Sequence, residues 1–105
     1  MFDMKMFKQV QQMQKNLMKV QEELAQKTVE ASAGGGVVKV VVAGNQEIKQ
    51  IILDPSVVDA NEVEMLQDLI LAAINEGMRL AKEMSEQEIA KVTAGLNLPG
   101  MPKLF

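Results

Sequence analysis

The sequence predicts an α+β protomer in which a three-stranded antiparallel meander lies between long N- and C-terminal helices, in the order α-β-β-β-α. Three observations predict it. Apolar residues recur every three or four positions at the start of the chain, alternate every two in the middle, and return to the helical period afterwards. The 105 residues suit one compact domain. We divide it into a helical arm (1–27), a sheet (28–54), a second helix (59–94) and an irregular tail (95–105).

The first helix is predicted by "KQVQQMQKNLMKVQEELAQK", which contains no glycine or proline. Its apolar residues are spaced alternately four and three apart, as at the a and d positions of a coiled coil. About 24 helical residues would make a rod roughly 36 Å long. The apolar seam, which we interpret as a dimer or core seam, comprises Met6, Val10, Met13, Leu17, Val20 and Leu24.

Strands are predicted in the segments "TVEASA", "VVKVVVAG" and "EIKQIILD". The second is the clearest, because its valines are β-branched and only Lys39 interrupts them. In the second of these, Val38, Val40 and Val42 should share one face. The glycines of "AGGGV" and the "AGNQ" stretch mark the two connecting turns. Pro55 ends the third strand because it cannot donate a ladder hydrogen bond. The short turns make the sheet antiparallel, and one of its faces must be covered.

The second helix is expected to begin at Asp59, with Glu62 completing a capping box. The small residues at 73, 77 and 81 would let this helix approach the sheet closely. Ser85 and Glu88 form a second possible capping box, so the helix either continues to 94 or breaks near Ser85.

The lengths of these elements predict a homodimer. A three-stranded meander is about 15–20 Å across, so it covers neither helix completely. The two helices could pack on each other, but we expect them to leave the sheet at opposite ends, because they flank the meander in the sequence. Exposing the large apolar side chains of the seam would forgo roughly 1.5–3 kcal/mol for each of them. A second copy of the chain is the most economical cover, and two-fold dimers are the commonest closed assemblies.

The charges are unevenly placed along a chain whose net charge is −3. The first 20 residues are basic, whereas residues 59–88 are acidic. The basic residues of the first helix fall at c and f positions, away from the seam: Lys5, Lys8, Lys15 and Lys19. One interpretation is a solvated helix face. The other is contact with the phosphates of a nucleic acid, since lysine is a flexible point charge suited to backbone binding.

The sequence resembles the YbaB/EbfC family of small bacterial nucleoid-associated proteins along nearly its whole length. The resemblance rests on the Gln/Met/Lys-rich first helix, "GVVKV", "IILDP", "DLILAA" and "GLNLPG". It implies a homodimer with protruding helical arms that binds duplex DNA and alters its conformation, in the cytoplasm and nucleoid. DNA contacts would then fall first on the lysines of the arm, and second on Lys27, Arg79 and Lys82. The acidic second helix departs from a DNA-gripping surface.

Other kinds of function are weakly supported. "AGGGV" lacks the Lys-Ser/Thr of a phosphate-binding loop and precedes a strand. The chain has no histidine or cysteine, so we expect no catalytic centre, no metal site and no disulfide. No apolar run is long enough to span a bilayer, no signal peptide is evident, and we expect no cofactor or small-molecule substrate. The alternative to DNA binding is a protein-interaction module whose arms clamp another protein.

Overall fold

A computed structural model gives the structure of the protein and describes residues 4–94. The element order is α1 (Met4–Gln26), β1 (Thr28–Ala33), β2 (Val38–Ala43), β3 (Ile48–Leu53), a short 3-10 turn (Pro55–Val57) and α2 (Val63–Ala94). The α-β-β-β-α order is therefore confirmed. The predicted tail, residues 95–105, lies outside the described residues.

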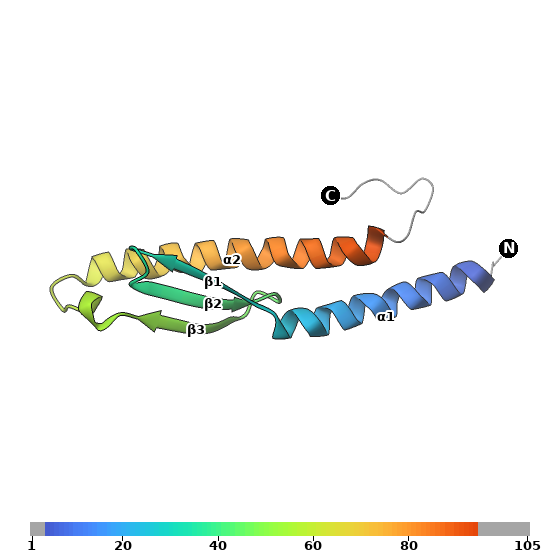
Figure 1. The fold of residues 1–105 in the computed structure, drawn as a ribbon, viewed down its shortest axis with the longest axis horizontal. Coiled ribbons are helices and arrows are strands. Elements are labelled where there is room, and N and C mark those ends of the chain that lie inside the picture. The colour runs from blue at the N-terminus through green and yellow to red at the C-terminus, as the bar shows by residue number, and fades with distance from the viewer. Residues whose placement is uncertain (1–3, 95–105) are drawn as a thin grey trace.

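The three strands form one antiparallel sheet in the order β1-β2-β3. α2 lies along one face of this sheet, and α1 extends away from its end (Figure 1). The molecule is consequently elongated, with extents of 70 × 23 × 17 Å.

The core lies between α2 and the inner face of the sheet, which is the face that α2 covers. Val38, Val40 and Val42 are fully buried, as their alternation predicts. The residues of α2 that pack against this face are small, namely Ala73, Gly77 and Ala81. A Cβ placed on Gly77 would lie 2.8 Å from Val42 Cγ2 and 2.9 Å from Val40 Cγ2, so only glycine fits this approach.

α2 packs on β1 and β2 and leaves β3 largely uncovered. Ile51 shows the consequence. It pairs with the fully buried Val40 and so points to the inner face, yet it is 45% exposed. Ile48 and Ile52 on the same strand are also exposed, so β3 is an apolar edge of the sheet.

The start of the second helix differs from the prediction at Asp59. Asp59 accepts a hydrogen bond from the backbone N–H of Asn61, and its carbonyl accepts one from that of Glu62. These bonds close a turn before the helix, which begins at Val63. No break occurs at Ser85, and the helix is continuous to Ala94.

The two helices project from the same end of the sheet and contact each other, contrary to the expectation that they leave at opposite ends (Figure 1). The reason is their length. α2 starts at the far end of the meander, but its 32 residues extend about 48 Å, whereas a six-residue strand covers about 20 Å. Its C-terminal half therefore passes the sheet and lies beside α1. Part of the predicted seam is covered within one chain.

Candidate nucleic-acid interface

The lysines of α1 occupy one side of that helix. With 100° between successive residues, they fall within an arc of about 80° and along about 21 Å of the axis. All of them are exposed, and no acidic residue occurs from Met4 to Gln21. We call this surface the lysine face, and it comprises Lys5, Lys8, Lys15 and Lys19.

Within residues 4–94, three members of this face, Lys8, Lys15 and Lys19, form no ion pair. No carboxylate oxygen of the described chain therefore lies within ion-pair distance of these three ammonium groups. A row of unpaired ammonium groups on an exposed helix attracts anions, and its field adds along the row.

The apolar seam lies on the opposite side of α1 and is covered progressively. Leu24 is buried, and Val20, Leu17 and Met13 are half-buried. Val10 and Met6 are 51% and 57% exposed. The part of the seam nearest the sheet is therefore core, and the part near the N-terminus is an open apolar surface.

The junction of α1 with the sheet is fixed at Gly44, which sequence reasoning did not identify as a contact. Its backbone N–H donates to the carbonyls of Leu24 and Lys27, each at 2.9 Å. A Cβ at this position would lie 2.7 Å from Leu24 Cδ2 and 2.9 Å from the Leu24 carbonyl oxygen. The absence of a side chain at Gly44 therefore lets the end of α1 pack directly against the sheet, which fixes the direction of the arm.

Lys27 lies at this junction rather than on the lysine face. Its Nζ is 3.4 Å from Oε1 of Glu88 on α2, and Lys91 Nζ is 3.2 Å from the same oxygen. Hydrogen bonds from Lys91 and Lys27 hold the pKa of the Glu88 carboxyl below its usual value. Lys27 therefore connects the arm to α2, a tertiary pairing that no sequence spacing indicates.

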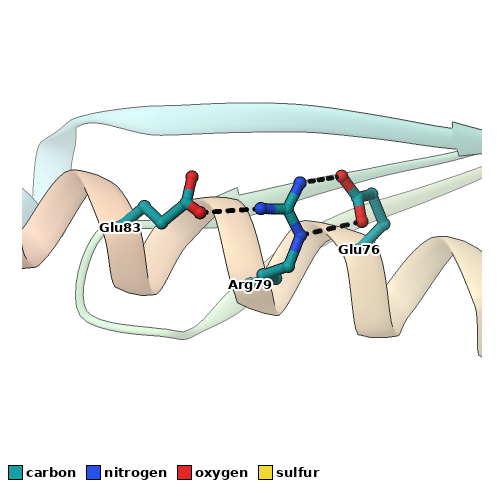
Figure 2. A network of polar contacts seen from close by, with 3 residues as sticks. All are labelled: Glu76, Arg79 and Glu83. Atoms are coloured by element: carbon teal, nitrogen blue, oxygen red, sulfur yellow. Dashed lines mark hydrogen bonds and ion pairs between the residues drawn. The ribbon is translucent and has the colours of Figure 1, made fainter.

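Arg79 lies on the outer side of α2 between two carboxylates (Figure 2). It donates to Glu76 from Nε (3.1 Å) and Nη2 (2.5 Å), and to Glu83 from Nη1 (2.7 Å). These contacts raise the pKa of Arg79 and lower that of Glu76, chiefly through the hydrogen bonds between them. The guanidinium is already paired with two anions, so binding a phosphate would require it to give up these partners.

Lys82 lies beside a cleft of about 420 Å³ between α1, α2 and the β2–β3 turn. Ser85 and Ile89 of α2 also line this cleft, opposite Gln21 of α1. The residues predicted second for DNA contact, namely Lys27, Arg79 and Lys82, thus fall in three separate surroundings, and the structure does not gather them with the lysine face.

Two other kinds of site are absent from the part of the chain that the structure describes. Among residues 4–94, no cluster of three or more acidic, histidine or cysteine side chains could hold a metal ion. None of the helices in this part of the chain is both long and apolar enough to cross a membrane.

Comparison with known proteins identifies the family. The family model described as the YbaB/EbfC DNA-binding family matches residues 1–96. The chain belongs to this family. The resemblance drawn from the sequence motifs is thereby confirmed.

Members of the YbaB/EbfC family in two bacteria are close to this chain. It is 56% identical over 96 residues to the nucleoid-associated protein Teth39_2199 of Thermoanaerobacter pseudethanolicus, covering 91% of this chain and 86% of that protein. It is 59% identical over 98 residues to a nucleoid-associated protein of Acetivibrio thermocellus, covering 93% and 85%. Both relatives are matched over most of their length.

The fold is also similar to a solved structure. The crystal structure of the uncharacterized protein HP0035 from Helicobacter pylori matches with a TM-score of 0.73 at 22% identity. The match covers 83% of this chain and 91% of that one. At this identity the likeness supports the fold alone.

Proposed function

We propose that this YbaB/EbfC protein is a nucleoid-associated protein that binds duplex DNA as a homodimer, mainly through the phosphate backbone, and alters the conformation of the DNA. The observation that carries the proposal is the lysine face of α1. It offers four cations along about 21 Å, a length that corresponds to about six base pairs at 3.4 Å each. The names of the family and of its relatives point to the same partner.

The chemistry of the face favours phosphates over base edges. It contains no arginine for bidentate contact with guanine and no aromatic side chain for stacking. Ammonium groups on flexible stems neutralise phosphates without reading sequence. Binding should therefore be salt-sensitive and weakly sequence-specific. The acidic α2, with Glu76 and Glu83 around Arg79, would turn away from DNA and orient the protein so that α1 faces it.

A second copy of the chain is supported by the uncovered apolar surface of β3. Ile48 and Ile51 lie on the inner face of the sheet, opposite buried valines of β2, yet they are 37% and 45% exposed on an edge strand. Ile52 is exposed on the other face of the same strand. Leu71, on the exposed side of α2, is 58% exposed. Exposed apolar surface on an edge strand is typical of a protein interface, and a two-fold partner would cover the same surface on both chains. The homodimer would present two lysine faces.

Two arms on one dimer account for a change in DNA conformation. Each arm would contact phosphates at a separate place, so that DNA held by both must adopt the spacing and angle set by the dimer. Such a protein would organise and protect DNA in the cytoplasmic nucleoid and modulate gene expression. Lys27, Arg79 and Lys82 would have a secondary role, limited by their distance from the lysine face and by the carboxylates that already pair with the first two.

A protein-interaction module remains the second candidate, because the outer part of the seam, at Met6 and Val10, is exposed. In that case the arms would clamp a protein partner and the lysines would only solvate the helix. The two candidates differ in their response to salt and to charge reversal on α1.

A gel-shift titration with duplex DNA separates them. We expect the triple variant K8E/K15E/K19E to lose the shift. The matched control K39E/K49E/K91E changes the net charge equally but alters lysines of other elements (β2, β3 and α2) that each lie beside a glutamate, so it should retain most of the affinity. Circular dichroism would verify that both variants fold. Equal loss in the two variants, or full binding by the first, would refute a role for the lysine face.

The homodimer is tested separately by sedimentation. Ile51→Asp places a charge in the proposed interface and should shift the protein toward monomer. Gln50→Asp adds the same charge to the same strand, but Gln50 pairs with Val41 and points to the opposite face of the sheet. A wild-type protein that sediments as a monomer at micromolar concentration would contradict the proposal.

A further inference from the structure

The outer seam of α1, which we define as Met6, Val10 and Met13, is the least covered part of the seam: Met6 and Val10 are 57% and 51% exposed, and Met13 is half-buried. Farther along α1, Asn16 and Val20 face Lys91 and Val92 of α2 across a cleft of about 400 Å³. α2 ends two residues later, at Ala94. α1 continues beyond this point (Figure 1), and the exposure of its seam rises from there toward the N-terminus.

The chain that follows α2 therefore starts beside the outer seam. It has the sequence "GLNLPGMPKLF", residues 95–105, and lies outside the described residues. Five of its eleven side chains are large and apolar, and Lys103 carries its one side-chain charge. Eleven extended residues span up to about 36–40 Å, whereas the seam from Met13 to Met6 is only about 10 Å long. The tail is long enough to cover the seam completely.

The composition of the tail also suits this site. Pro99 and Pro102 prevent continuation of α2 and favour an extended backbone. An extended segment beside a helix can place several apolar side chains against a row of others, which removes both from water. Because the lysine face lies on the opposite side of α1, a tail in this position would leave that face open.

We propose that the C-terminal tail, residues 95–105, packs along the outer seam of α1 of its own chain. The chain closes on itself at this end of the molecule: α2 lies beside the inner part of the arm, and the tail extends the same cover to the outer part. This assignment separates the apolar surfaces of the protein. The outer seam is covered from within the chain, and the isoleucines of β3 are left for a second copy.

Methyl NMR of the native methionines tests the proposal. The chain has no cysteine, so Lys103→Cys accepts a single nitroxide spin label in the tail. The full chain, labelled with carbon-13 at its methionine methyl groups, reports at Met6 and Met13 on the seam. Met65, near the start of α2 and far from the arm, is the internal control (Figure 1). Single Met→Leu variants assign the signals.

Two mixtures distinguish the tail's own arm from that of a partner. In the first, chains that each carry both the spin label and the isotope label are diluted with an excess of unmodified chains. Attenuation in this mixture reports contact within a chain. In the second, spin-labelled chains without isotope are mixed with isotope-labelled chains without a spin label, so that attenuation reports contact between chains. We expect Met6 and Met13 to be attenuated strongly in the first mixture and weakly in the second, with Met65 unaffected in both.

A variant of the tail verifies that apolar packing is the cause. L104S/F105S on the spin-labelled chain should restore the signals of Met6 and Met13, because the polar side chains no longer favour burial. Three results would overturn the proposal: no attenuation in the first mixture, attenuation confined to the second, or attenuation that persists unchanged in L104S/F105S. The second of these would show that the tail covers the arm of a partner.

Discussion

Gly77→Ala examines how closely α2 approaches the sheet. The new Cβ would lie 2.8 Å from Val42 Cγ2, 2.9 Å from Val40 Cγ2 and 3.6 Å from the Ala31 Cβ. Both valines are fully buried, so neither can turn into solvent. Overpacking a core costs about 1–3 kcal/mol. Alanine also gains about 1 kcal/mol over glycine inside a helix. The free energy of unfolding should therefore fall by about 0–2 kcal/mol. The steric cost and the gain in helix propensity must be measured separately.

A second variant isolates the steric contribution. Val42→Ala removes two methyl groups that contribute about 1.6 kcal/mol by transfer, and the cavity raises its cost to roughly 2–3 kcal/mol. In the double variant the methyl of the new alanine occupies part of that space. The double variant should therefore lose less stability than the two single variants lose together, by a coupling energy of about 1 kcal/mol or more.

The assay is urea unfolding of both single variants and the double variant at one protein concentration, since dimerisation would make stability concentration-dependent. Ala72→Gly, at an exposed position of the same helix, measures the helix-propensity contribution alone. If Gly77→Ala raised stability by the amount that Ala72→Gly lowers it, and added fully to Val42→Ala, the close contact of α2 with the sheet would be refuted.

Two further predictions concern a turn and an ion pair. Gln46 in the β2–β3 turn has φ +65°, a conformation that suits glycine. Gln46→Gly should therefore raise the free energy of unfolding by about 0.5–1 kcal/mol, measured with urea. A lower free energy of unfolding would contradict this prediction. Glu88 has a lowered pKa in the folded protein, so its contribution is present above the unfolded pKa and is lost as pH falls through the folded value. Wild type should therefore be more stable than Glu88→Gln at pH 7, and the two should converge in parallel unfolding curves once the pH lies below the folded pKa of Glu88. A constant difference across the acid range would exclude titration of Glu88 as the cause.

Local patterns predicted most of the fold. The alternation of Val38, Val40 and Val42 identified the buried face of β2, and the three-four spacing identified α1. The start of α2 was predicted too early, at Asp59. An aspartate can cap a helix, but it can also close a turn, and in the structure Asp59 closes the turn that precedes α2. Ser85 could begin a helix but equally fits inside one when packing supports it.

The candidate site was predictable where it depends on one helix and not where it depends on two. The 3.6-residue period alone puts the lysines of α1 on one side. Likewise, Glu76 and Glu83 lie three and four positions from Arg79, a spacing that brings side chains together on any helix. The contact of Lys27 with Glu88 and the approach of Gly44 to Leu24 depend on tertiary geometry. Neither leaves a signal in a single sequence.

The most direct test of the central claim, that the lysine face of α1 contacts DNA phosphates, is the salt dependence of duplex binding. The logarithm of the binding constant should fall linearly with the logarithm of salt concentration, with a slope of about −0.9 for each phosphate neutralised. Replacing Lys8, Lys15 and Lys19 by glutamine should reduce the magnitude of that slope by about 2.7 if one arm binds, and by about 5.4 if both arms of a dimer bind. A slope that does not change on this replacement would contradict the claim.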